Sequence, residues 1–167
     1  MAEIDIILEH LTQAVSVGYC GDAAAAVERL LAEDGIPARV EKDGSVSAHL
    51  RGSGKGAVML ACHIDEIGFV VSRIDDRGRL FMSAVGGFDA RILPGQEVTV
   101  LGRKKLRGYI AVKPPHLLQK DERERAPLLR DLFIDTGLSP AAVRKNIQLG
   151  DSICLYGPYK RLSDDLR

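Results

Sequence analysis

The sequence predicts an α/β chain in two parts, in which helices and a mixed segment precede a small β-rich part. Apolar residues first recur at helical spacing, and they then form a continuous run over residues 57–62. From Gly68 onward, short β-like segments alternate with turn signals. We therefore expect an α/β segment followed by a small β barrel or sandwich.

Two amphipathic helices are predicted at the start of the chain. The first follows from apolar residues three and four positions apart between Ile4 and Val15. The second has an apolar face between Asp22, its predicted N-cap, and Gly35, its predicted stop. The opening of the chain is thus expected to be helical.

A hairpin and a buried strand are predicted next. An Asp-Gly pair at 43–44, of the kind that closes tight hairpins, separates the strand-like segments 38–42 and 45–50. The glycine-rich stretch 52–56 is a connector and not a phosphate loop, because such a loop follows a strand and opens a helix. The apolar run 57–62 is typical of a strand buried on both faces of a helix-covered sheet.

The β-rich part contains six predicted strands and one late helix. The strands are expected at residues 69–74, 80–83, 98–101, 109–112, 132–135 and 152–156. The helix has Ser139 as its N-cap, Pro140 at its first position and Lys145 near its end.

Composition excludes several classes of partner. Lysine plus arginine equals aspartate plus glutamate at 23 each, so no excess charge favours nucleic acid or an anionic membrane. The three cysteines are far apart, which fits neither a disulfide framework nor a zinc-thiolate site and indicates a reducing compartment. With no secretory signal and no apolar run of membrane-spanning length, we expect a cytoplasmic protein.

His63 and Asp65 are the candidate site residues, directly after the apolar run. A neutral imidazole is a good zinc or cobalt ligand, and a carboxylate usually orients it through its other ring nitrogen. Residues two apart on an extended segment point to the same side, so Asp65 could hold the ring while the free nitrogen faces a metal. Taken alone, the pair is a weak signal, because a capped strand end more often gives this pattern, and the apolar run before it and the Glu-Ile-Gly after it strengthen the metal-site interpretation. Glu66 is left out of the site because it is expected to point away.

The other candidates for chemistry are weaker. His116 follows two prolines and is interpreted as a structural hydrogen-bond donor, while His10 and His49 are interpreted as surface or packing residues. A Gly-x-Ser-x-Gly nucleophile motif is absent, so serine hydrolysis is not expected. Paired carboxylates for glycan hydrolysis have no defined separation in this sequence.

Four sequence blocks, at residues 62–69, 85–96, 113–118 and 131–137, together resemble the glutamyl aminopeptidase and cellulase-M-like metallopeptidases, which include the tetrahedral aminopeptidases. The resemblance implies an α/β catalytic domain that holds two divalent metal ions, zinc or cobalt, and an inserted β-barrel-like dimerisation domain. It implies that His63 is a metal ligand and that Asp65 is the catalytic-site acid that orients it.

The resemblance also implies a division of the chain. Residues 1–68 would be the amino-terminal segment of the catalytic domain, 69–158 the dimerisation domain, and 159–167 a return segment. The family's remaining metal ligands and its general base have no match. The tail 164–167 reads Asp-Asp-Leu-Arg, and its leucine breaks the family's bridging Asp-Asp-Arg motif, so we do not identify the two.

The expected function is metal-dependent removal of amino-terminal residues from peptides by the full-length protein. The chain by itself is expected to be truncated, inactive and without firmly bound metal, and to associate with itself through the β-rich part. The alternative is a non-catalytic dimerisation or assembly module with a vestigial metal half-site. A truncated catalytic domain would also leave the strand at 57–62 with an open edge, which association is expected to cover.

Overall fold

The computed structural model describes residues 3–18, 21–117, 119 and 125–163. The chain forms two compact units, of which unit 1 comprises Met1–Glu66 and Gly157–Arg167 and unit 2 comprises Ile67–Tyr156. No helix within the described ranges has the length and apolar character needed to cross a bilayer.

Unit 1 opens with the two predicted helices, α1 (Glu3–Gln13) and α2 (Gly21–Glu33). The N-cap prediction for Asp22 is wrong, because α2 begins at Gly21 and Asp22 lies inside the first turn, where an acid still favours the helix N-terminus. The predicted helix stop at Gly35 is confirmed. Gly35 has a φ of +70°, and the N–H of Ile36 donates to the Leu31 carbonyl at 2.8 Å, so α2 ends in a left-handed glycine cap.

The predicted hairpin follows as β1 (Ala38–Val40) and β2 (Val46–Ala48), which are shorter than expected. They pair antiparallel, and their turn contains Gly44 at a φ of +86°. The Ser45 N–H donates to the Asp43 carboxylate at 2.9 Å, which stabilises the turn.

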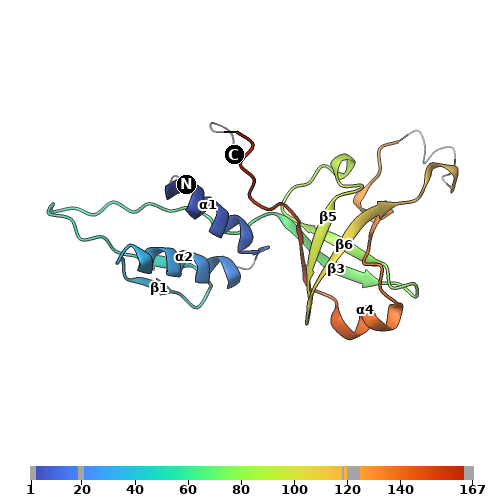
Figure 1. Cartoon of the computed structure of the whole chain (residues 1–167), viewed down its shortest axis with the longest axis horizontal. Coiled ribbons are helices and arrows are strands. Elements are labelled where there is room, and N and C mark those ends of the chain that lie inside the picture. Colours follow the sequence, from blue (N-terminus) through green and yellow to red (C-terminus); the bar gives the residue numbers. More distant parts are fainter. Residues whose placement is uncertain (1–2, 19–20, 118, 120–124, 164–167) are drawn as a thin grey trace. The chain divides into compact units, whose positions relative to one another are not determined.

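The prediction of a buried strand at 57–62 is wrong for this chain. No β pairing in the described residues includes this segment, and Figure 1 draws it as a plain tube. Val58, Met59 and Leu60 are 89%, 87% and 93% exposed. A strand is buried on both faces only where neighbouring strands and helices cover it, and the described part of unit 1 supplies neither to this segment.

Contacts that are distant in sequence hold the rest of unit 1 together. The Tyr159 hydroxyl donates to the Asp5 carboxylate at 2.9 Å, and Asp5 is only 1% exposed. Val17 and Glu66 form an isolated parallel bridge, in which the Glu66 N–H donates to the Ser16 carbonyl at 2.8 Å. The segment after the barrel is therefore tied to α1, and the segment after His63 is tied to the residues that follow α1.

Unit 2 is a closed antiparallel barrel with the strand order β3-β4-β7-β6-β5-β8. Its strands are β3 (Gly68–Ile74), β4 (Leu80–Val85), β5 (Glu97–Leu101), β6 (Lys105–Val112), β7 (Leu132–Asp135) and β8 (Ser152–Leu155). The 3₁₀ turns η1 (Ala90–Ile92), η2 (Pro115–Leu117) and η3 (Leu129–Asp131) and the helix α4 (Pro140–Asn146) connect them. The six predicted strands are confirmed. They form a closed barrel and not a sandwich.

The start of β6 differs from its prediction. The strand begins at Lys105, four residues before the expected start, and Lys105 pairs with Leu101. Residues 102–104 form the bend between β5 and β6, and the exposed Lys105 is compatible with the outer face of a strand. The predicted helix is confirmed as α4, where the Ala142 N–H donates to the Ser139 hydroxyl at 3.4 Å.

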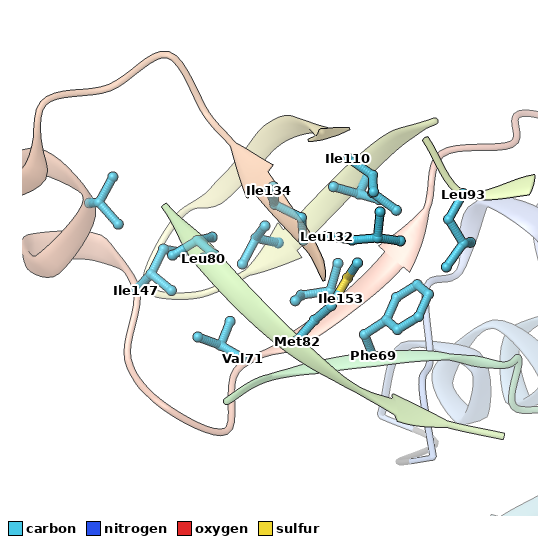
Figure 2. Packing of buried hydrophobic residues seen from close by; sticks show 13 residues of the cluster. Phe69, Val71, Leu80, Met82, Leu93, Ile110, Leu132, Ile134, Ile147 and Ile153 are labelled. Carbon is cyan, nitrogen blue, oxygen red and sulfur yellow. The ribbon is translucent and has the colours of Figure 1, made fainter. Parts of the chain in front are cut away.

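The barrel interior is the large hydrophobic core of the chain. Along β5, Val98 and Val100 are fully buried while their neighbours are less so, as the two-residue period of a strand requires. Figure 2 shows the side chains of the facing strands meeting inside the barrel. The core consists of Phe69, Val71, Leu80, Met82, Leu93, Val98, Val100, Ile110, Leu132, Ile134, Val143, Ile147 and Ile153. Val143 of α4 and Ile147 just after it belong to this core.

Asp75 organises the turn between β3 and β4. Its carboxylate accepts hydrogen bonds from the Arg77 N–H at 3.0 Å, the Arg79 N–H at 2.9 Å and the Arg79 Nε at 2.7 Å. Burial alone would raise the pKa of Asp75, but the hydrogen bonds from Arg79 and Arg77 and the charge of Arg79 lower it below 3.8.

We expect Asp75→Ala to lower the free energy of unfolding of the barrel by about 1–3 kcal/mol, because the turn loses three hydrogen bonds to a charged group. Asp76→Ala is the matched control. Asp76 is the next residue in the turn, its side chain is fully exposed, and its ion pair with Arg144 is long at 3.5 Å. Urea denaturation of both variants measures the difference, and equal effects would contradict the role given to Asp75.

The same carboxylate predicts a pH dependence. Because its folded pKa lies below its unfolded value, the stabilisation is fully present above the unfolded pKa and is lost as the pH falls through the folded pKa. The stability difference between wild type and Asp75→Ala should therefore shrink as the pH falls below the ordinary aspartate pKa of about 4. Denaturation at a series of pH values measures it, and a constant difference over that range would argue against this assignment.

Candidate functional site

The candidate site lies on the exposed segment that follows residues 57–62 in unit 1. The structure brings His63 and Asp65 together, with His63 Nδ1 2.9 Å from the Asp65 carbonyl oxygen and 3.2 Å from Oδ1 of its carboxylate. The His63 side chain is 86% exposed and that of Asp65 is 36% exposed. The pair is therefore a local arrangement within three residues, and it needs no other element to form.

These contacts decide which ring nitrogen carries the proton. A carbonyl oxygen can only accept a hydrogen bond, so Nδ1 of His63 must be the donor. In a neutral imidazole the other nitrogen, Nε2, then holds a lone pair. Because the ring is largely exposed, this lone pair is accessible to a metal ion or a proton.

Glu66 lies beside the pair but has a different environment. Desolvation raises the pKa of its carboxyl group, and a hydrogen bond with the Ser16 backbone partly opposes this rise. Its own N–H is used in the bridge to Ser16. Glu66 thus attaches the segment to Ser16, which follows α1, and no described contact joins it to His63.

The remaining histidines occupy separate places. His116 is exposed and lies in the 3₁₀ turn η2 of unit 2, while His10 lies in α1 and His49 is exposed just after β2. Nδ1 of His10 is buried and has no hydrogen-bond partner in the structure. Across the described ranges, no group of three or more histidine, cysteine, aspartate or glutamate side chains could hold a metal ion. The tail 164–167 lies outside the described residues.

One polar residue of unit 1 was missed by the sequence analysis. Asp5 lies on α1 with an almost fully buried side chain that binds the Tyr159 hydroxyl. Acids are common in the first turn of a helix, so the sequence pattern carries no signal for burial here. Its partner is 154 residues away in the chain, and only the folded structure pairs them.

Several proteins with known structures or curated sequences are similar to this chain. The TET aminopeptidase of the marine sediment archaeon Thaumarchaeota archaeon SCGC AB-539-E09 matches 98% of this chain with a TM-score of 0.88 and 30% sequence identity. The PhTET1-12s structure, described as a dodecamer, matches 97% of the chain with a TM-score of 0.79 and 27% identity. The SgcX protein of Escherichia coli K12 is 37% identical over 112 residues, which make up 65% of this chain.

The family model for M42 glutamyl aminopeptidases matches residues 44–166, and the chain belongs to this family. It spans only part of its relatives, with 47% of the thaumarchaeal chain, 48% of the PhTET1 chain and 30% of SgcX covered. The resemblance stated from the four sequence blocks is confirmed. The roles of His63 and Asp65 in the site stay predictions.

We expect the neutral His63 ring to carry its proton on Nδ1, because both of its hydrogen-bond partners accept. Asp65→Ala removes one acceptor and should raise the fraction of rings that are protonated on Nε2. Glu66→Ala is the matched control, since its carboxylate has no described contact with the ring. Long-range ¹H–¹⁵N spectra of the imidazoles measure both populations, and an unchanged tautomer ratio in Asp65→Ala would show that the carboxylate does not orient the ring.

Proposed function

We propose that this chain is part of a metal-dependent aminopeptidase that removes amino-terminal residues from peptides. In this proposal His63 is a ligand of one of two divalent metal ions, and Asp65 orients the His63 ring. The observation that supports it most directly is the exposed His63 ring whose Nδ1 is held by Asp65 and whose Nε2 is free. Membership of the M42 family supports the reaction class.

The described residues fit one part of a metal centre. Zinc or cobalt, when bound, would supply a Lewis acid and an activated water for peptide hydrolysis. This chain would contribute an imidazole fixed in the correct tautomer for binding through Nε2. Zinc sites use three or four protein ligands, and the described ranges contain no cluster of that size around His63. Metal retention and hydrolysis therefore require residues beyond this pair.

Unit 2 has the properties expected of an assembly domain. In this proposal, residues 1–68 belong to the catalytic domain, 69–158 form the dimerisation domain and 159–167 return towards the catalytic domain. The barrel has a complete core of its own, and it still exposes large side chains, among them Tyr109 at 55% and Leu149 at 64%. The dodecameric PhTET1-12s relative supports self-association.

The cellular place proposed for the protein is the cytoplasm. Among the described cysteines, Cys62 is exposed and Cys154 is buried, and neither is part of a disulfide bond. Free thiols persist in a reducing compartment. The proposed partners of the chain are peptides and further copies of itself. The balanced charge gives no support for a role with nucleic acid or a membrane.

A non-catalytic assembly module is the second candidate function. It is favoured by the contrast between the complete core of the barrel and the single described histidine at the candidate metal site. In that case the His63 and Asp65 pair would be a vestigial half-site. The two candidates differ in whether a completed protein hydrolyses peptides.

We expect the isolated 167-residue chain to retain no stoichiometric zinc or cobalt after dialysis and to show no aminoacyl-anilide cleavage, because one histidine is too few ligands. Elemental analysis and the anilide assay measure the two properties. His63→Ala is the control, and it should be indistinguishable from the wild-type chain in both. Bound metal with turnover that His63→Ala abolishes would sink this expectation.

A further inference from the structure

A bulge in β3 exposes two successive residues of the barrel. In a regular strand, Arg73 would face the same side as Val71, whose side chain points into the barrel (Figure 2). The register of β3 against β4 shifts between these two residues, so that Val71 pairs with Met82 and Arg73 pairs with Phe81. Ser72 and Arg73 are therefore both exposed. Bulges re-aim side chains in this way beside many active sites.

The re-aimed arginine lies over an aromatic ring. The guanidinium carbon of Arg73 is 3.5 Å from the centroid of the Phe81 ring. At this distance the guanidinium plane must lie nearly parallel to the ring, because an N–H group that pointed at the ring would collide with it. The N–H donors then point outward in the guanidinium plane. No hydrogen bond or ion pair with the described residues occupies these donors, so they are available to a ligand.

Arg73 lines a groove on the surface of unit 2, beside β3, β4 and η3. The groove has a volume of about 470 Å³. Its polar and charged lining consists of Ser72, Arg73, Ser83 and Arg130, and none of the described residues that line it is acidic. The groove therefore presents two positive charges and two hydroxyl groups.

The carboxylate nearest in sequence to the second arginine is already engaged. Asp131 follows Arg130, and its carboxylate accepts hydrogen bonds from Arg125 at 2.6 Å and from the Leu128 N–H at 2.9 Å. The hydrogen bond from Arg125 lowers the pKa of Asp131, and the charge of Arg130 adds to this effect. Asp131 is thus held by Arg125 and Leu128, and it does not line the groove.

The charge and size of the groove indicate the chemistry of its ligand. Carboxylates match the planar fork of a guanidinium with two parallel hydrogen bonds. A volume in the range of about 300–1,000 Å³ is typical of sites for small ligands, which favours a short peptide over a folded protein. A nucleotide fits less well, because its base needs an open aromatic face and Arg73 covers the face of Phe81.

We propose that this groove binds a short acidic peptide. One carboxylate of the peptide pairs with Arg73 and a second pairs with Arg130, while the hydroxyl groups of Ser72 and Ser83 donate further hydrogen bonds. The inference goes beyond the proposed function, because the groove contains neither His63 nor Asp65 and binding of the peptide needs no metal.

The experiment is a titration of the whole ¹⁵N-labelled 167-residue chain in the presence of EDTA. The probe is a four-residue peptide with glutamate at its first and third positions and alanine at the others. Its amino terminus is acetylated and its carboxyl terminus is amidated, so only the side chains carry charge. We expect saturable shifts of the backbone amide signals of Ser72, Arg73, Ser83 and Arg130. The same peptide with glutamine in place of glutamate should bind at least about fivefold more weakly, because the ion pairs are lost.

Three variants locate the binding site. Arg73→Ala should weaken binding about three- to fivefold, as expected for the loss of one exposed ion pair. Arg73→Lys keeps the charge without the planar fork, so it should recover only part of the affinity. Arg103→Ala is the matched control, since it removes an exposed arginine that does not line the groove and should bind the peptide normally. Arg73 and Arg103 are both exposed, so the variants keep the barrel core, and their amide spectra verify this.

Several results would overturn the inference. These are an absence of saturable shifts at millimolar peptide, equal binding of the glutamate and glutamine peptides, and equal weakening by Arg73→Ala and Arg103→Ala. Equal shifts with inorganic phosphate would show a general anion surface. The same shifts produced by raising the concentration of the chain alone would identify a second copy as the occupant. Because the titration measures neither metal nor hydrolysis, its failure would leave the proposed function standing, and an inactive completed protein would leave the groove assignment standing.

Discussion

The pairing of β8 with both β3 and β5 closes the barrel, and the rest of unit 2 depends on it. Ile153 pairs with Phe69 of β3 on one side and with Val100 of β5 on the other. With this strand in place the barrel has no open edge, and all three residues are fully buried. A register shift between Val71 and Arg73 in β3 adds the local bend that strands of a small barrel need.

The need for neighbouring strands also explains why residues 57–62 are exposed. Their composition suits a buried strand at least as well as that of β5, but their backbone has no described neighbour with which to pair. An apolar sequence determines that a strand can be buried, and it does not provide the covering layers. Residues 57–62 thus lack neighbouring strands and covering helices in the described chain, while each barrel strand has a neighbour on both sides.

The candidate site directly follows residues 57–62. The hydrogen bonds between His63 and Asp65 are local, so the ring is oriented before any partner or metal arrives. Preorganisation of this kind lowers the entropic cost of completing a metal centre. The hydrogen bond from the Glu66 N–H to the Ser16 carbonyl anchors the backbone next to the pair. Under the proposed function, the pair would be one preorganised part of a metal centre.

The sequence by itself determined the features that depend on neighbouring residues. These include the two helices, the glycine cap at Gly35, the turn of the β1–β2 hairpin, the positions of the barrel strands, and the pairing of His63 with Asp65, which are two residues apart. Each rests on local periodicity, capping or turn chemistry, which act over a few positions. The family could also be identified from the four short sequence blocks, because their residues and their order are properties of the sequence.

Only the tertiary structure decided the features that join distant parts of the chain. The strand order of the barrel, the burial of Asp5 against Tyr159 and the exposure of residues 57–62 all depend on which segments meet in space. Local propensity does not predict such contacts, because a strand or a buried carboxylate is stabilised by partners far away in the sequence.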